Sequence, residues 1–329
     1  MAGELWRQSW QFGKEVTYGT YVPATRVMYG TEVGLTRARD PRPYAVMTGT
    51  RDNVRGFTQG PVQAGGMMNY PVSADEMIEL LLIGLKGGVT PTTPAMATNT
   101  RLWTFTPGTS LDSASIEWND GARDWRGSGM HCDQMTIQGA VNQGNTVSCT
   151  LFGSDVVLGA GTGALTQRTP TYLDGWQTRF FIDAFAGTPG TTEKTGTLLN
   201  WNISIQNGLA RKYTAGNTLA ASGITIAPLT ITAQLTFEAS HATSAAEYAN
   251  WDATTKRIVS LQFQDETSFI ETTFRRFVQI DLPGNWSTVD LGQTADNTRV
   301  YAFAFQYVYD PTNAFGVQVR CQNTRTSAF

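Results

Sequence analysis

Residues that could bind a metal or act as a general base are few in this chain. It contains two histidines, His131 and His241, which lie far apart in the sequence. The tripeptide His131-Cys132-Asp133 is the one place where several metal-ligand types are adjacent. Successive residues of a strand point to opposite faces, so this tripeptide is poorly suited to close on one ion. The sequence therefore predicts no metal site there.

Pairs of carboxylates could perform acid–base chemistry. The candidates are Glu271 with Asp281 or Asp290, and Asp120 with Asp124. Nothing in the sequence fixes the separation of the two members of a pair. Charges at turns and strand edges are usually solvated or face a neighbouring subunit, and we interpret these carboxylates in that way.

Two further signatures of catalysis are missing from the sequence. The Gly-rich run at 156–163 lacks the Lys-Ser/Thr of a phosphate-binding loop, and no convincing helix follows it. No serine lies in a Gly-x-Ser-x-Gly elbow, and two histidines leave little choice of general base. We expect a protein that is not an enzyme and that has no catalytic residue, no cofactor and no metal.

The composition indicates a β protein with little affinity for nucleic acid. Of 329 residues, 33 are glycine and 16% are charged, and the formal net charge is −3. The charged fraction is well below the roughly 25% of an average globular protein. No run of Lys or Arg offers stable binding to phosphates. A weakly acidic surface still allows DNA to slide past it without sticking.

The cysteines and the apolar segments predict synthesis in the cytosol. Cys132, Cys149 and Cys321 are odd in number, widely spaced and without a CxxC pair, so we expect reduced thiols. The N-terminal residues lack the apolar core of a secretory signal. The most apolar stretch, 77–85, is nine residues long, far short of the ~20 that cross a bilayer. We expect no membrane insertion.

Alternation of apolar and polar residues predicts most of the elements. In 229–238 the odd positions are apolar and the even positions are polar, which is typical of a half-buried strand. Similar alternation occurs at 135–138, 147–152, 199–205, 258–263, 278–282 and 300–307. The polar rows of two strands are candidates for a functional face: Thr230, Thr232, Gln234 and Thr236 in one strand, and Gln134, Thr136 and Gln138 in the other.

Two short helices interrupt the strands, at 73–86 and 244–251. Ser73 with Glu76, and Ser244 with Glu247, have the spacing of capping pairs. Each helix follows a possible strand and precedes further strands. The two capping pairs are separated by the same offset, which favours a degenerate internal duplication. The alternative is that an α+β protein contains two strand–helix units by chance.

The pattern predicts four segments along the chain. A Gly/Thr-rich stretch without periodicity separates two similar half-chains. The segments are an aromatic arm at 1–30, a first β domain at 31–157 with the helix 73–86, a linker at 158–170, and a second β domain at 171–329 with the helix 244–251.

Aromatic residues crowd the predicted arm before any regular strand pattern. They are Trp6, Trp10, Phe12, Tyr18, Tyr21 and Tyr29. Aromatic anchors are enriched at protein interfaces, so we predict that they contact a neighbouring subunit. The alternative is that the arm covers the core of its own domain.

The segment 13–26, Gly-Lys-Glu-Val-Thr-Tyr-Gly-Thr-Tyr-Val-Pro-Ala-Thr-Arg, resembles the N-terminal segment of tail tube (major tail) proteins of long-tailed bacteriophages. A similar Gly-x-Glu-x-x-Tyr-Gly-Thr phrase precedes a first strand there. The resemblance continues at 60–85, where a strand runs into a short apolar helix. It also covers 202–237, where an Asn-x-Ser-Ile-x-Asn-Gly strand leads to the Thr-rich strand.

This resemblance implies a mainly β fold with short helices, in tandem β-sandwich or barrel domains whose sheets join those of neighbours into a continuous inner barrel. Stacked rings would then form the hollow virion tail, assembled in the host cytoplasm, through which double-stranded DNA passes without specific binding. Three copies with two domains each would give a pseudo-six-fold ring, which we prefer to a hexamer. The polar rows would line the lumen or an outer wall. Other expected partners are phage tail proteins such as tape measure and terminator proteins.

Two other classes of protein fit parts of the pattern. Alternating strands, many aromatics and the terminal Phe329 are also found in outer-membrane β-barrels, although two capped helices and a final segment without alternation disfavour that class. A carbohydrate-binding β-sandwich would present Trp118, Trp125 and Trp176 as platforms for sugars.

Overall fold

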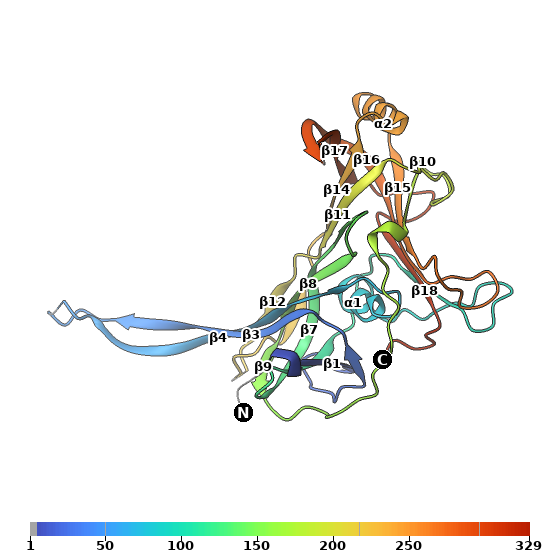
Figure 1. Cartoon of the computed structure of the whole chain (residues 1–329). Helices are drawn as coiled ribbons and strands as arrows, with labels where there is room; N and C mark the ends of the chain where they lie inside the picture. Colours follow the sequence, from blue (N-terminus) through green and yellow to red (C-terminus); the bar gives the residue numbers. More distant parts are fainter. Residues whose placement is uncertain (1–4, 50, 217, 296) are drawn as a thin grey trace.

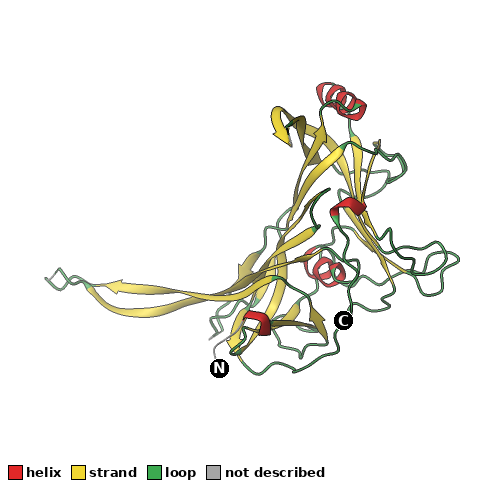
Figure 2. Cartoon of the chain, in the orientation of Figure 1, coloured by secondary structure: helices red, strands yellow, loops and turns green. Residues whose placement is uncertain are grey.

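A computed structural model describes residues 5–49, 51–216, 218–295 and 297–329. The fold is mainly β with two short α-helices, as predicted, and sixteen of the described strands form one sheet (Figures 1 and 2).

The elements up to residue 158 comprise nine strands and one α-helix. They are η1 (Leu5–Arg7), β1 (Ser9–Lys14), β2 (Arg26–Met28), β3 (Glu32–Ala45), β4 (Val54–Pro71), α1 (Met77–Gly84), β5 (Arg101–Phe105), β6 (Ala114–Asn119), β7 (Asp124–Ala140), β8 (Thr146–Gly153) and β9 (Asp155–Leu158).

The remaining elements again comprise nine strands and one α-helix. They are η2 (Gly175–Gln177), β10 (Thr178–Ala184), β11 (Leu198–Gln206), β12 (Ala210–Lys212), β13 (Gly223–Thr225), β14 (Thr230–Glu238), α2 (Ala242–Asp252), β15 (Arg257–Gln264), β16 (Phe277–Ala295), β17 (Thr298–Tyr307) and β18 (Gln318–Asn323).

The two halves of the chain pair their strands in the same order. In the first half β3 pairs β4, β4 pairs β8, and β8 pairs β7. In the second half β11 pairs β14, β14 pairs β17, and β17 pairs β16. The helix α1 follows β4 and α2 follows β14, so the two strand–helix units lie at equivalent places. Pairing of β7 with β11 joins the halves into one sheet.

The longest strand of each half also bends into a second layer in the same way. The first part of β7 pairs β6, which pairs β1, and the first part of β16 pairs β15, which pairs β10. Both long strands carry a register shift where their partners change. The shift falls between Cys132 and Gln134 in β7, and between Trp286 and Thr288 in β16. A second link between the halves is the pairing of β18 with β5.

The helices are placed near the predicted positions, but the capping prediction is wrong for both. Helix α1 begins at Met77, after a turn, and the Ser73 hydroxyl accepts a hydrogen bond from Asp75 N instead. In α2, the N-cap is His241, whose ring accepts a hydrogen bond from Thr243 N. Glu247 is buried and accepts hydrogen bonds from Trp286 and Arg257, so it is not free to reach the helix terminus. Burial and ion pairing therefore override local capping chemistry.

A continuous apolar core lies on one side of the joined sheet. It includes side chains from α1 and from both halves, such as Leu81, Ile137, Ile203 and Phe305. Burial of this apolar area supplies the main stabilising free energy of such a fold. Neither helix of the described residues is long and apolar enough to cross a membrane.

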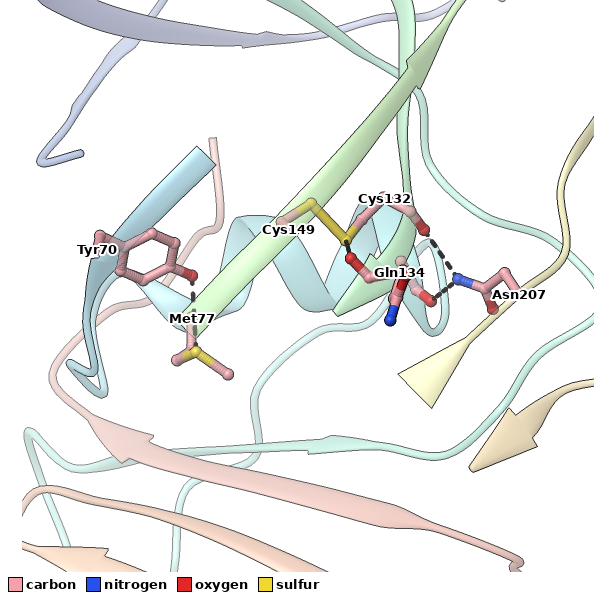
Figure 3. Close-up of a disulfide and its surroundings, with 7 residues drawn as sticks. Tyr70, Met77, Cys132, Gln134, Cys149 and Asn207 are labelled. Atoms are coloured by element: carbon pink, nitrogen blue, oxygen red, sulfur yellow. Dashed lines mark hydrogen bonds between the residues drawn. A yellow bond between two sulfur atoms is a disulfide. The ribbon is translucent and has the colours of Figure 1, made fainter. Parts of the chain in front are cut away.

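The prediction of three reduced thiols is wrong for two of the cysteines. Cys132 and Cys149 form a disulfide between the neighbouring strands β7 and β8 (Figure 3). Cys132 lies opposite Leu151, two residues from Cys149 on β8, and the two cysteine Cα atoms are 5.9 Å apart, within the range that a disulfide spans. Spacing along the sequence does not reveal this proximity. Cys321 is free and buried, and burial raises the pKa of its thiol.

A buried ion pair fastens the C-terminal segment to α1. The Arg325 guanidinium donates two hydrogen bonds to Glu79, at 2.8 and 2.5 Å. It also donates to the backbone oxygens of Asp75 and Ala328. The Arg26 side chain of β2 lies 3.7 Å from the same carboxylate. The Glu79 side chain has no solvent exposure, so its charge depends on these partners.

We predict that Arg325→Ala destabilises the chain by about 3–5 kcal/mol, because the variant leaves a buried carboxylate without its main partner. The matched control is Arg179→Ala, which removes the exposed pair with Glu193 and should cost at most about 1 kcal/mol. Chemical denaturation of both variants measures the difference. Equal effects would contradict the role assigned to Arg325.

Candidate functional surfaces

The side of the joined sheet opposite the core carries a long polar face. Alternation places every second residue of β8, β7, β11, β14 and β17 on this side, and the registers set these residues opposite one another in rows. The members are Thr146, Ser148, Thr150, Gln134, Thr136, Gln138, Asn200, Asn202, Ser204, Gln206, Thr230, Thr232, Gln234, Thr236, Ala302, Ala304 and Gln306. We call these residues the polar face; none is charged.

One row shows how the polar face crosses the two halves. Thr136 of β7 lies opposite Ser204 of β11, which lies opposite Thr232 of β14. The row continues to Gln306 of β17. Gln134 also donates a hydrogen bond of 3.1 Å to the Ser204 hydroxyl across the junction of the halves. The polar face is therefore continuous through the β7–β11 pairing.

The polar face is hollowed in two places. Depressions with volumes of about 750 and 810 Å³ lie along it, and both are lined by Asn202 and Gln234. Their linings are dominated by amide and hydroxyl side chains, with Asp290 of β16 at one margin. Groups of this kind hold water and offer no cation for a phosphate.

All seven residues predicted for a functional face lie on the polar face, and the structure brings the two predicted rows together. The row of β7 and the row of β14 are separated by one strand, β11. Sequence reasoning did not name the β11 residues Asn200, Asn202, Ser204 and Gln206, although their alternation with apolar residues is visible. It also missed β8, whose polar positions are short hydroxyl residues. Their assignment to a lumen or an outer wall stays a prediction.

The N-terminal phrase that carries the family resemblance has a structural role. The buried Glu15 carboxylate accepts hydrogen bonds from Gly19 N, the Ser115 hydroxyl and Gly129 N, at 2.8 to 2.9 Å. Gly19 has a φ of +74°, which favours glycine there. A Cβ atom on Gly13 would lie 2.6 Å from the Pro23 oxygen, so that position needs glycine too. The phrase thus fastens the segment before β2 to β6 and β7.

The predicted aromatic arm is part of the folded body. Its β1 strand pairs β6 in the sheet, and Trp10 and Phe12 are buried in the core of their own chain. For these two residues the structure agrees with the alternative that the arm covers its own domain. Trp6 is 77% exposed, and its contact with a neighbour stays a prediction.

The three tyrosines of the segment also contact their own chain. Tyr18 packs on the His131 ring, and the Tyr21 hydroxyl donates a 2.5 Å hydrogen bond to Glu117. The Tyr29 hydroxyl donates to the backbone oxygen of Arg168 in the predicted linker. These bonds leave part of each ring accessible, so the predicted contact with a neighbour is not decided by them.

The carboxylates considered for acid–base chemistry have structural partners. Glu271 accepts hydrogen bonds from the backbone of 98–100 and from the Thr100 hydroxyl, and the latter is the main reason why its pKa falls to about 2. Asp281 is buried beside Arg320. Within the described ranges, no group of three or more His, Cys, Asp or Glu side chains is placed to hold a metal ion.

Two of the three tryptophans considered as sugar platforms are packed against the core. Trp118 stacks on Trp10 with ring centroids 6.0 Å apart, and the Trp125 indole donates a hydrogen bond to Asp120. Trp176 alone of the three is largely exposed. The three rings therefore do not form a common platform.

This architecture, with one core and one long uncharged face, defines a mainly β protein built on a single joined sheet. The family model described as Phage tail tube protein matches residues 6–304, and the chain therefore belongs to the phage tail tube protein family. The match confirms the resemblance found in the sequence. It makes the chain a structural tail tube subunit and a component of the virion tail. No curated protein matches the chain.

A second buried carboxylate near α1 predicts a dependence of stability on pH. Burial raises the pKa of Glu76 to about 7, and Glu79 adds to this effect. Arg168 lies 2.9 Å from Glu76 but without hydrogen-bond geometry. An unfolded glutamate titrates near pH ~4.3, so folding favours the protonated form between the two values. The contribution of Glu76 to the free energy of unfolding is therefore fully present below about pH 4, and it is lost as the pH rises through 7.

We predict that Glu76→Gln reduces the loss of stability between pH 5 and pH 8 by on the order of 2 kcal/mol. Urea unfolding of the wild type and the variant at both pH values measures this difference. Glu193→Gln is the control, because an arginine hydrogen bond lowers the pKa of that exposed carboxyl. A variant that loses as much stability as the wild type would refute the assignment.

Proposed function

We propose that this chain assembles into rings that stack into a hollow tube, and that the polar face lines the channel through which the phage genome passes. The observation that carries this proposal is the continuity of the uncharged polar face across the β7–β11 junction. A wall of amides and hydroxyls holds water and gives DNA phosphates neither a cation to bind nor a dense negative charge to oppose passage. Other tail proteins, such as tape measure and terminator proteins, would contact the same tube.

The distribution of the other elements supports the inner rather than the outer position for this face. Helix α1 packs against β7 on the core side, where the Cys132 side chain lies close to Gly84. In Figure 1, α1 and the C-terminus lie to the same side of the strands β7 and β8. The polar face carries two open depressions, and Arg211 of β12 stacks on the Phe152 ring at its margin near Thr150. Such a surface can line a narrow channel without side elements that would obstruct it.

The repeated pairing order supports a trimeric ring. Each chain contributes two strand sets of the same order, β3–β4–β8–β7 and β11–β14–β17–β16. We propose that these halves are the duplicated domains predicted from the sequence. Three chains would then supply six equivalent sets around the channel, and we prefer this arrangement to a ring of six chains.

The β3–β4 hairpin supports stacking of the rings. It projects far from the rest of the chain (Figure 1), and its outer part carries exposed apolar side chains, among them Tyr44, Met47 and Phe57. Exposed apolar groups gathered on one projection mark a contact site. We propose that the hairpin reaches a neighbouring subunit and covers these side chains there.

We predict that the concentrated purified protein forms rings and tubes visible by negative-stain electron microscopy. The matched variant replaces residues 41–59 with an Asn-Gly turn, joining the two strands close to where Asp40 and Gly60 lie together. It should form rings that do not extend into tubes. A wild type that remains monomeric at high concentration would refute the proposal.

A second prediction tests the position of the polar face. The double variant Gln138→Lys, Gln234→Lys places cations on this face and should slow DNA ejection from phage particles at least several-fold at low salt, with recovery at high salt. The control Ala245→Lys, Ala246→Lys adds the same charge to exposed positions of α2. Ejection kinetics followed by DNA fluorescence measures the effect. Equal rates for the two variants would place the face outside the channel.

A further inference from the structure

Among the described residues, the row of strands β3–β4–β8–β7–β11–β14–β17–β16 has an edge without a partner at each of its two ends. Strand β3 pairs with β4 on one side only. In β16, residues 288–295 pair with β17 on one side, while the other side is bare beyond Gly284, where the pairing with β15 ends. The Ser287 oxygen accepts a hydrogen bond from the Trp251 indole, so the bare edge begins after it. Unpaired edges are templates for another strand.

The junction inside the chain shows which strand fits such an edge. The edge of β7 that corresponds to the bare edge of β16 is occupied by β11. Strand β11 is the first strand of the second set, and β3 holds the same place in the first set. The internal pairing of β7 with β11 therefore has a counterpart in which β16 pairs with β3. Both of these edges are bare in one chain, so the counterpart needs a second copy.

The register of this counterpart follows from two alignments within the structure. Gln134 and Thr288 are equivalent, because each follows the register shift of its long strand. In the first set, Gln134 lies opposite Thr150, Thr150 opposite Met67, and Met67 opposite Gly34. In the second set, Thr288 lies opposite Ala304, Ala304 opposite Gln234, and Gln234 opposite Asn202. Gly34 is therefore equivalent to Asn202.

The internal junction then supplies the pairing. Asn202 lies opposite Gln138, four residues beyond Gln134. Gln138 lies opposite Thr146, four residues before Thr150. In the second set, the residue four before Ala304 is Val300, and it lies opposite Gln293 because β16 shifts its register again after Asp290. Gln293 is therefore expected opposite Gly34 of the second copy.

We propose that residues 288–293 of β16 in one copy pair antiparallel with residues 34–38 of β3 in the next copy. This inference rests on the proposed ring and names its subunit contact. Thr288 lies opposite Ala38 and Asp290 opposite Thr36, and the bulged residues Leu291 and Gly292 together lie opposite Leu35. Because two different edges meet, the contact is head-to-tail and can close into a ring.

The side chains agree with this register. Leu291 is 43% exposed in the single chain, an unfavourable state for a leucine that one neighbour would remove. Its proposed partner Leu35 already packs toward the core. The equivalent pair in the internal junction is Ile137 opposite Ile203, both buried. Thr288 and Asp290 line the depression on the polar face, and Thr36 lines a surface continuous with Thr150. The pairing would thus set Thr36 of the second copy beside Asp290 on the polar face, next to a less polar strip that contains Met67 and Arg211.

Cysteine cross-linking tests the register. The single variants are Thr288→Cys and Ala38→Cys. Both side chains are exposed in the single chain, and the proposed pairing does not depend on a hydrogen bond from either of them. The two proteins are mixed, assembled and oxidised, then separated on a non-reducing gel, while electron microscopy records the rings. Arg39→Cys replaces Ala38→Cys in the control, because the neighbouring position points to the other side of the strand.

Covalent dimers from the Thr288→Cys and Ala38→Cys mixture, at least ten-fold more abundant than from the control mixture or from either variant alone, would support the proposal. Rings without this cross-link, or with equal cross-linking in the control, would overturn the register and leave the proposed function standing. Absence of rings from the wild type and all variants would overturn both.

Discussion

The antiparallel pairing of β7 with β11 is the interaction on which the rest of this structure depends. It joins two strand sets of equal order, so that neither of these edges is left to aggregate. It also aligns the polar residues of one half with those of the other, as the row from Thr136 through Ser204 to Thr232 shows. Without this pairing the polar face would consist of two short surfaces, and the chain would lack an internal template for contact with its neighbours.

The core and the polar face are consequences of the same alternation. Ile137 and Ile203 meet on one side of the junction, while Gln138 and Asn202 meet on the other. A shift of the register by one residue would place the amides in the core and the isoleucines on the polar face. The register is therefore held by the cost of burying amides without partners. Some buried charges are paired, as Glu79 is with Arg325, and others, such as Glu15, are held by neutral hydrogen-bond donors.

Much of this fold could be predicted from the sequence because alternation is a local signal. The strand at 229–238 and the polar rows of β7 and β14 are visible in the residues themselves. Burial and long-range pairing are not visible there. Glu76 and Glu247 have the spacing of capping residues, yet one faces Arg168 and the other Trp286 and Arg257. The disulfide of Cys132 with Cys149 likewise depends on the pairing of β7 with β8. The aromatic residues near the N-terminus show the same limit, since Trp10 and Phe12 are core residues of their own chain.

The central claim is that the joined sheet continues from chain to chain and turns its polar face to the channel. A cryo-electron microscopy reconstruction of the assembled tube, calculated without imposed ring symmetry, tests it most directly. We expect three chains per ring, one uninterrupted inner sheet, and Gln138, Asn202 and Gln234 on the wall of the lumen. Separate sheets for each chain, or these residues on the outer surface, would contradict it.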